Sequence, residues 1–232
     1  MQTINIERLI KLDYRANESY KNLRTNIQLC GSDIKTIMFT STTPGEGKST
    51  VSFNLAVSLA EAGKKVIFID ADLRKSVLVG RYKINKSVKG LTHFLSGINK
   101  FEDVMYGTNV DNLNVVFSGP VPPNPTELLG NKVFKTLLKV LRDLYDYIII
   151  DTPPIGSVID SAIVAQECDG TVVVVGSNMV GYKYAQKAIE QLKKTNTTIL
   201  GAVLNKVDVN DNKYYGKYYG KYYGRYSDAG EE

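Results

Sequence analysis

The sequence predicts an α/β fold with a doubly wound, mainly parallel sheet that carries helices on both faces. Short apolar runs alternate with helical patterns along most of the chain, an order that is typical of βαβ units. The run at 65–70 is apolar throughout its interior, as expected for a strand that a parallel sheet buries on both faces. The chain has 232 residues, 43% hydrophobic and 23% charged, which suits one globular domain of this class.

The individual elements follow from where the apolar patterns begin and end. We expect strands at 36–41, 65–70, 113–118, 147–151, 171–175 and 198–205, and helices at 17–30, 48–62, 126–145, 157–167 and 180–194. Asn17 is a suitable N-cap for the first helix, and Gly63 is a suitable C′ residue for the second. Residues 84–110 indicate short helices and loops, and the proline-rich run at 119–125 indicates a rigid loop.

A glycine-rich loop joins the first of these strands to the following helix. It runs Thr42-Thr43-Pro44-Gly45-Glu46-Gly47-Lys48-Ser49-Thr50, with Thr42 where such loops usually have their first glycine. Glycines let backbone N–H groups approach a phosphate chain, and the new helix adds its free N–H groups and the positive end of its dipole. Lys48 can reach the β- and γ-phosphates, and Ser49 can place its hydroxyl on Mg²⁺. The strand–loop–helix order therefore predicts that residues 44–50 bind ATP with Mg²⁺. It also predicts the fold of a P-loop nucleotide hydrolase.

Carboxylates follow two of the predicted strands. Asp70 and Asp72 end the strand at 65–70, and Asp151 ends the strand at 147–151. Ligands of parallel α/β sheets bind at the carboxyl ends of the strands. An aspartate that ends a buried strand is costly unless it meets a cation or hydrogen-bond donors, and beside a phosphate loop the expected cation is Mg²⁺. We expect Ser49, Asp72 and Asp151 at the metal; surface acids at a strand end and a turn-capping aspartate are the alternatives.

The last predicted strand ends in Leu204-Asn205-Lys206-Val207-Asp208. Asn205 could contact the purine base of the nucleotide, because it ends a parallel strand at the edge of the sheet where ligands bind. A polar turn at the end of a strand is equally compatible with this sequence.

The C-terminal residues 211–232 differ in composition from the rest of the chain. Lys-Tyr-Tyr-Gly occurs there three times in succession, and Arg225-Tyr226 follows. Seven of the fifteen tyrosines lie in this segment: Tyr214, Tyr215, Tyr218, Tyr219, Tyr222, Tyr223 and Tyr226. Without aliphatic residues the repeats cannot form a core, so we expect a flexible, disordered tail after a domain that spans 1–210. A merely soluble linker is the alternative.

The charge distribution limits the class of partner. The net charge is +5, and the tail adds nothing to it, because Lys213, Lys217, Lys221 and Arg225 balance Asp211, Asp228, Glu231 and Glu232. A nucleic-acid-binding module in which the tyrosines stack on bases would need positive charge beside them. We therefore expect no nucleic-acid partner. No run reaches the roughly 18 apolar residues of a membrane helix, and 1–11 lacks the apolar core of a signal peptide, which favours a cytoplasmic protein.

Together these motifs resemble the bacterial tyrosine kinase family, in its cytoplasmic CpsD/CapB type that serves capsular and exopolysaccharide synthesis. The resemblance covers nearly the whole chain and rests on five segments in a fixed order: the Walker A loop at 44–49, the second aspartate motif at 67–74, the loop and helix at 118–129, the Walker B strand at 148–153, and the tyrosine-rich tail. Related ATPases of the ParA/MinD class share this fold and act as switches without kinase activity. They have a lysine where this chain has Thr43, and they lack a tyrosine tail.

The resemblance implies an ATP-dependent protein-tyrosine autokinase that phosphorylates its own tail tyrosines in trans. Lys48, Asp70, Asp72 and Asp151 would be catalytic, with Asp70 accepting or orienting the tyrosine proton; the roles of Asp70 and Asp72 could be exchanged. The family also implies a membrane-bound polysaccharide co-polymerase of the CpsC/CapA kind as activator, which would recruit the chain to the inner face of the membrane, and a cognate phosphotyrosine phosphatase as a second partner.

The helix at 17–30 is expected to mediate oligomer contact. Its Glu18, Lys21 and Arg24 are similar to the Glu-x-x-Arg-x-x-Arg pattern with which the family builds a ring, except that lysine replaces the first arginine. Lysine keeps the charge but loses the bidentate fork of arginine. From spacing alone, a solvated charged face is the alternative.

Overall fold

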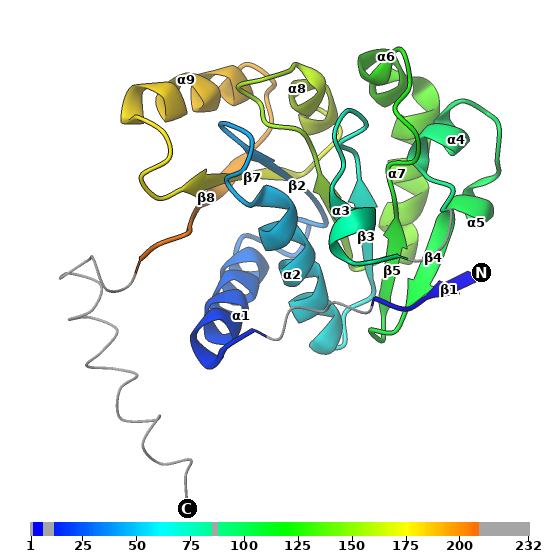
Figure 1. Ribbon diagram of the computed structural model, residues 1–232, viewed down its shortest axis with the longest axis horizontal. Helices are drawn as coiled ribbons and strands as arrows, with labels where there is room; N and C mark the ends of the chain where they lie inside the picture. The colour runs from blue at the N-terminus through cyan, green and yellow to red at the C-terminus, as the bar shows by residue number, and fades with distance from the viewer. Residues whose placement is uncertain (1, 7–11, 85–87, 209–232) are drawn as a thin grey trace, which may run out of the picture.

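The computed structural model describes residues 2–6, 12–84 and 88–208 (Figure 1). The strands are β1 (Gln2–Ile4), β2 (Thr36–Ser41), β3 (Val66–Asp70), β4 (Met105–Thr108), β5 (Leu113–Val116), β6 (Tyr147–Asp151), β7 (Gly170–Gly176) and β8 (Ile199–Asn205). The helices are α1 (Tyr14–Leu29), α2 (Lys48–Glu61), α3 (Leu78–Arg81), α4 (Leu91–Leu95), α5 (Phe101–Val104), α6 (Pro125–Gly130), α7 (Lys132–Leu144), α8 (Asp160–Ala165) and α9 (Tyr182–Lys193). The predicted tail at 211–232 lies outside the described residues.

One sheet with the strand order β1-β4-β5-β3-β6-β2-β7-β8 forms the centre of the molecule. Every neighbouring pair is parallel except β4 and β5. The strands β3, β6 and β2 lie side by side in the middle, with Asp70 opposite Asp151 in the register of β3 and β6. Because these three strands are parallel, the loops that follow them leave the sheet at one edge, where the site is formed.

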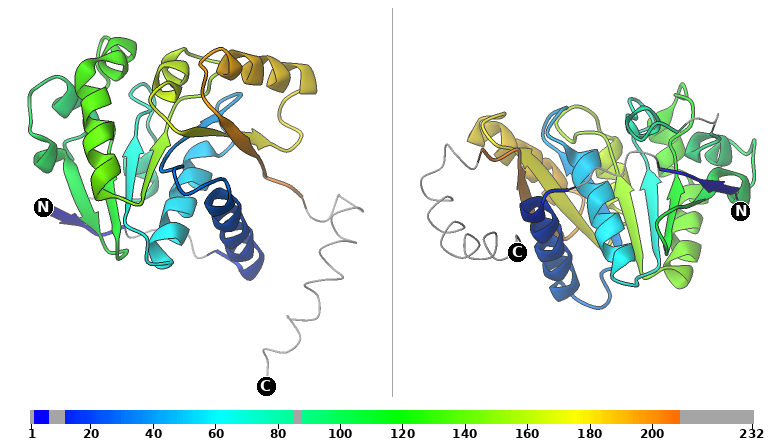
Figure 2. Two further views of the ribbon diagram at one scale, coloured as in Figure 1. Left: turned by 180° about the vertical axis from the view of Figure 1, so that it is seen from behind. Right: turned by 60° about the horizontal axis from the view of Figure 1, so that its bottom comes forward.

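Helices cover both faces of the sheet, as two hydrophobic cores and the views in Figure 2 show. On one face α1, α2 and α3 pack over the side chains of Ile37, Phe39 and Phe68. On the other face α4 and α6 to α9 pack over Met38, Ile67 and Ile148. The alternation follows from the two-residue period of a strand, which sends successive apolar side chains to opposite faces. The predicted doubly wound fold is therefore confirmed.

The first helix begins earlier than predicted. It spans Tyr14–Leu29, and its N-cap is Asp13 instead of Asn17, because Asp13 Oδ1 accepts a 2.7 Å hydrogen bond from the N–H of Ala16. Asn17 lies inside the helix, where its own N–H bonds the Asp13 carbonyl. Either residue type can cap a helix, so local sequence did not distinguish them.

The single helix predicted at 126–145 is two helices, α6 and α7. Asn131 separates them with extended backbone (φ −78°, ψ 164°), and its side chain caps α7 by accepting from the N–H of Phe134 at 2.9 Å. The sequence did not predict the edge strand β1 or its neighbour β4, because strands of three and four residues are too short to show a clear apolar period. Within the described ranges, no helix is long and apolar enough to cross a bilayer.

Candidate active site

The glycine-rich loop joins β2 to α2 as predicted. Gly47 has φ 93° and precedes Lys48, the first residue of α2. Gly47 carries no side chain that could cap α2, so the first N–H groups of the helix face the loop, where phosphates bind in folds of this kind. Gly45 also has a positive φ of 87°. Both glycines therefore occupy backbone conformations that favour glycine.

Glu46 braces this loop from inside the protein. Its side chain is fully buried. Oε2 accepts hydrogen bonds from the Thr42 hydroxyl at 2.8 Å and the Thr43 N–H at 2.7 Å, and Oε1 accepts from the N–H of Gly176 at 3.1 Å. Thr42, where a glycine is usual, thus contributes a hydroxyl that fixes the carboxylate. Of Glu46, only the backbone can face a phosphate.

Asn205 ties the end of β8 to the same loop. Its Nδ2 donates to the Glu46 carbonyl at 2.8 Å. A Cβ built on Gly47 would lie 2.2 Å from that nitrogen, so the close approach requires glycine. The side chain of Asn205 thus lies beside the phosphate loop, where it positions the loop directly; its contact with a purine base stays a prediction.

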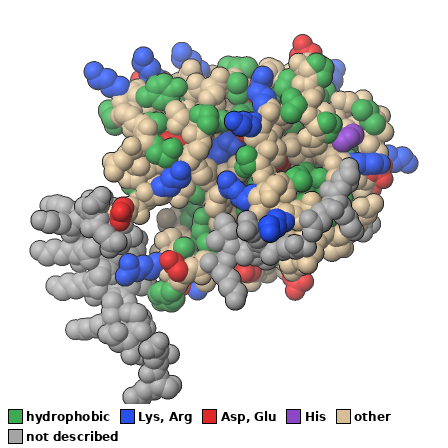
Figure 3. All heavy atoms as spheres, viewed as in Figure 1, with side chains coloured by type: hydrophobic (Ala, Val, Ile, Leu, Met, Phe, Trp, Pro, Cys, Tyr) green, Lys and Arg blue, Asp and Glu red, His purple; other side chains and the backbone are tan. Residues whose placement is uncertain are grey.

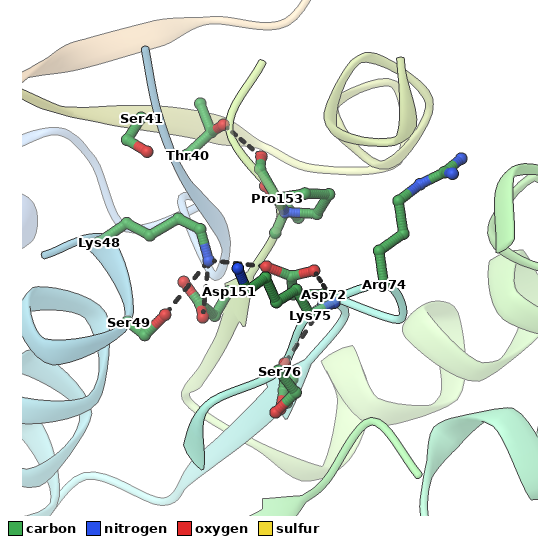
Figure 4. A network of polar contacts seen from close by, with 12 residues as sticks. Thr40, Ser41, Lys48, Ser49, Asp72, Arg74, Lys75, Ser76, Asp151 and Pro153 are labelled. Carbon is green, nitrogen blue, oxygen red and sulfur yellow. Dashed lines mark hydrogen bonds and ion pairs between the residues drawn. The ribbon is translucent and has the colours of Figure 1, made fainter. Parts of the chain in front are cut away.

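Lys48 lies between two carboxylates from different strands (Figure 4). Its Nζ is 3.2 Å from Asp72 Oδ2, 3.3 Å from Asp151 Oδ2 and 3.2 Å from Ser49 Oγ. Burial lowers the pKa of Lys48, but the charges of Asp151, Asp72 and Asp70 outweigh that effect and raise the pKa above its ordinary value. The lysine is therefore a permanent cation at this edge of the sheet.

Asp70 lies deeper than the other two carboxylates. It is fully buried, Oδ1 accepts from the N–H of Asp72 at 3.2 Å, and Oδ2 accepts a hydrogen bond from the Ser76 hydroxyl. Burial and then the charge of Asp151 raise the pKa of Asp70 to about 7. Burial also raises the pKa of Asp151. A substrate hydroxyl can reach Asp70 only if Ser76 gives up Oδ2.

The oxygen donors at this edge fit Mg²⁺. The Ser49 hydroxyl and the carboxylates of Asp72 and Asp151 converge on Lys48, and Mg²⁺ prefers hard oxygen ligands from one or two carboxylates completed by phosphates. In the described part of the chain, no group of three or more His, Cys, Asp and Glu side chains could hold a metal by itself. The donor set thus suits a metal that binds together with a nucleotide.

Two arginines extend the site beyond the predicted residues. Arg74 points away from Lys48 in Figure 4, and its guanidinium binds both oxygens of Asp160 at 2.7 and 3.0 Å. Thr126 Oγ1 donates to the same carboxylate at 2.7 Å. Burial raises the pKa of Asp160, but the bonds from Arg74 and Thr126 outweigh it and hold the pKa below its ordinary value. This pairing joins the loop after β3 to α8.

The second arginine, Arg81 of α3, donates a hydrogen bond from Nη1 to the Thr50 hydroxyl. Thr50 lies in the first turn of α2, directly after Lys48 and Ser49. No motif in the sequence singles out Arg81, since the contact joins residues that are 31 positions apart.

The helix α1 presents the three residues expected at an oligomer contact. Lys21 Nζ binds Glu18 Oε1 at 2.7 Å on the helix surface. Arg24 Nη1 instead donates to the carbonyl and hydroxyl of Ser58 in α2, at 2.8 and 3.2 Å. Binding of Arg24 to a neighbouring chain would exchange these contacts, and the role of all three residues in assembly stays a prediction.

Known proteins share both the sequence and this architecture. A family described as an AAA domain matches residues 34–209, so the chain carries a P-loop nucleotide-binding domain. The tyrosine-protein kinase CpsD of Streptococcus pneumoniae serotype 4 is 48% identical over 215 residues, which cover 92% of this chain and 95% of that protein. The tyrosine-protein kinase YwqD of Bacillus subtilis is 42% identical over 202 residues, covering 86% and 85%.

Solved structures give the same picture. The kinase domain of the Escherichia coli tyrosine kinase ETK has a TM-score of 0.82 at 32% identity, covering 89% of this chain and 82% of that chain. The chimerical protein CapA2B2 has a TM-score of 0.81 at 31% identity, covering 89% and 94%. The septum site-determining protein MinD of Pyrococcus horikoshii, complexed with Mg-ADP, has a lower TM-score of 0.63 at 28% identity, covering 73% and 69%. The chain therefore shares its architecture with the MinD class, but it belongs to the family of bacterial tyrosine-protein kinases, and within it to the CpsD type.

Proposed function

We propose that this protein is an ATP-dependent autokinase that phosphorylates the tyrosines of its own tail in trans and so regulates capsular or exopolysaccharide synthesis. The observation that carries the proposal is the convergence of Lys48 with Asp72 and Asp151, at 3.2 and 3.3 Å, beside the phosphate loop. Phosphoryl transfer passes through a loose transition state, so it needs mainly positioning and neutralisation of charge. Lys48, a cation held between the carboxylates that would bind the metal, can position the phosphates and neutralise their charge.

Each residue has a distinct part in this reaction. The backbone of 44–50 and Lys48 hold the β- and γ-phosphates, with Lys48 turning from the carboxylates toward the transferring group. Ser49 binds Mg²⁺ directly, with Asp72 and Asp151 beside it or bound through water. A bound Mg²⁺ would neutralise the charge that develops on the phosphate oxygens. Asp70 accepts or orients the proton of the tyrosine hydroxyl once Ser76 gives up Oδ2.

The length of the tail sequence allows transfer in trans. β8 ends at Asn205, whose side chain bonds the Glu46 carbonyl of the chain's own phosphate loop. Residues 211–232 are 22 residues, and a chain of that length can reach at most about 70 Å when fully extended. That reach is long enough for the site of a neighbouring chain.

Mixing two chains tests this function. One chain carries Lys48→Met and an intact tail, and the other is active but has its seven tail tyrosines replaced by phenylalanine. Mass spectrometry after incubation with ATP and Mg²⁺ should find phosphotyrosine on the tail of the inactive chain. An unlabelled inactive chain, together with wild-type labelling whose rate does not depend on protein concentration, would mean transfer in cis. Phosphotyrosine on Lys48→Met alone would rule out the kinase mechanism.

The expected partners follow from the same family. We propose a membrane-bound co-polymerase of the CpsC/CapA kind as the activator that brings the chain to the inner face of the membrane, and a cognate phosphotyrosine phosphatase that reverses the reaction. Adding the purified cytoplasmic segment of such a co-polymerase should raise the rate of tail phosphorylation. An unchanged rate at saturating segment would argue against this activator.

A further inference from the structure

The segment before α9 lies against the phosphate loop. β7 ends at Gly176, whose N–H donates to Glu46 Oε1, and the residues 177–181 lead from there to α9. Within this segment Met179 packs on the loop, since a Cβ built on Gly45 would lie 3.7 Å from Met179 Cε. Between β7 and α9 the chain thus contacts the phosphate loop twice, first at Glu46 and then at Gly45.

The first turn of α9 continues this contact. Tyr184 donates a 3.4 Å hydrogen bond from its hydroxyl to the carbonyl of Gly156, in the loop after β6. Gly156 in turn approaches the start of the phosphate loop so closely that a Cβ on it would lie 2.3 Å from the Thr42 carbonyl oxygen. The beginning of α9 therefore forms part of the rim of the proposed ATP site.

Tyr182, the first residue of α9, stands out on this rim. Its side chain is 81% exposed, whereas that of Tyr184 is 47% exposed. The hydroxyl of Tyr182 has no hydrogen-bond partner among the residues that the structure describes, in contrast to the hydroxyl of Tyr184. The local sequence Gly181-Tyr182-Lys183-Tyr184 consists of the same three residue types as the repeats of the tail.

We propose that Tyr182 is a phosphorylation site of this kinase in addition to the tail, an inference that rests on the proposed autokinase function. The Tyr182 hydroxyl oxygen forms a bond to the γ-phosphorus of ATP as the bond from that phosphorus to the β–γ bridging oxygen breaks. ADP leaves, and the hydroxyl proton passes to the carboxylate of Asp70 in the chain that supplies the site. The acceptor needs an accessible hydroxyl. Tyr182 is 81% exposed at the start of α9, and its hydroxyl has no hydrogen-bond partner in the described part of the chain.

The surroundings of Tyr182 suit a phosphorylated side chain. A phosphate adds about −1.5 to −2 charges. Lys183 and Lys187 are exposed on the first two turns of α9, and that end of the helix carries no acidic residue in its first turn. Negative charge near a helix N-terminus is favourable. Phosphorylation of Tyr182 is therefore compatible with an intact α9.

Full-length chains with altered tyrosines test this site. The tail variant has phenylalanine in place of Tyr214, Tyr215, Tyr218, Tyr219, Tyr222, Tyr223 and Tyr226, and it is compared with the same chain carrying Tyr182→Phe or, as the matched control, Tyr184→Phe. Each protein is treated with phosphatase, freed of it, and incubated with ATP and Mg²⁺ before mass spectrometry. We expect residual phosphotyrosine at Tyr182 of the tail variant, its loss with Tyr182→Phe, and its persistence with Tyr184→Phe.

The wild-type chain in the same experiment separates the two hypotheses. If its tail is phosphorylated but Tyr182 remains unmodified in every chain, the proposed function stands and the Tyr182 site is wrong. Phosphate on Tyr184 or Tyr14 instead of Tyr182 would overturn the site as well. If the wild-type chain itself carries no phosphotyrosine, the proposed function fails and the Tyr182 site fails with it. Equal melting temperatures of the variants would show that loss of label does not come from unfolding.

Discussion

The ammonium group of Lys48 lies 3.3 Å from Asp151 Oδ2 and thereby joins the phosphate loop to the neighbouring strand of the sheet. Asp151 is almost fully buried, and Asp72 contacts the same ammonium at 3.2 Å. The single positive charge of Lys48 thus offsets part of the repulsion between two carboxylates in a poorly solvated place. This arrangement gives Lys48 a structural role as well as the one in phosphate binding.

We expect Lys48→Met to abolish tyrosine phosphorylation and also to lower the stability of the fold. Removing one member of a buried ion pair leaves the other charges uncompensated, at a cost of about 3 kcal/mol. Chemical denaturation measures this loss, and Lys75→Met, at an exposed lysine of the same region, serves as the control. A Lys48→Met chain as stable as the wild type would show that the carboxylates do not depend on the lysine.

Asp151→Asn should weaken nucleotide binding mainly in the presence of Mg²⁺. The carboxylate is a metal ligand only in the complex with Mg²⁺, and loss of such a group typically lowers metal affinity about 10- to 100-fold. Calorimetric titrations of ADP with Mg²⁺ and with a chelator measure the two affinities. Equal losses in both conditions would assign Asp151 to structure alone.

Asp160→Asn should lower the free energy of unfolding at neutral pH by about 1–2 kcal/mol, because Asp160 accepts charge-assisted bonds from Arg74. The pKa of Asp160 is lower in the folded chain than the unfolded value of about 3.9. Its contribution is therefore fully present above that value and is lost as the pH falls through the folded pKa. Denaturation from pH 7 to pH 3 should show the wild-type advantage shrinking in the acid range. A constant difference would contradict this linkage.

Arg81→Gln should weaken the binding of both ADP and ATP by about tenfold, which corresponds to about 1.4 kcal/mol. The guanidinium of Arg81 donates a hydrogen bond to the Thr50 hydroxyl in the first turn of α2. Its positive charge therefore lies close to where we expect the phosphates to bind. Thr50→Val removes the hydroxyl but keeps the arginine, so it should weaken binding less. If Arg81→Gln lowers the melting temperature but leaves both affinities unchanged, Arg81 acts only as a tie between α3 and α2.

Glu18→Ala combined with Arg24→Ala should shift self-associated protein toward the monomer, if α1 docks into a neighbouring chain. Arg24 also bonds Ser58 within its own chain, so the variant loses an internal contact too. Ser58→Ala is the matched control, because it removes the hydroxyl partner and leaves the surface of α1 unchanged. If light scattering shows equal assembly of the double variant and the wild type, these residues form only a solvated charged face of α1.

The sequence by itself determined the chemistry of the site and the class of the fold. The glycine loop, the strand-ending aspartates and the strand–helix alternation are local patterns that can be recognised in short stretches of sequence. The boundaries of β2 and β6 could be predicted for the same reason, since continuous apolar runs end there at polar residues. The start of α1 and the break at Asn131 could not, because several Asp and Asn residues can each cap a helix.

The tertiary structure alone decided which of these residues meet. The order β3-β6-β2 places Asp70 opposite Asp151 and brings both to Lys48. Arg74 and Asp160 lie 86 positions apart, and Asn205 and the Glu46 carbonyl lie 159 apart. Such pairs leave no periodic trace in the sequence, because strand order and the packing of loops across the sheet edge bring them together. Local patterns thus specify the groups that can bind a nucleotide, and long-range packing determines their positions and their charges.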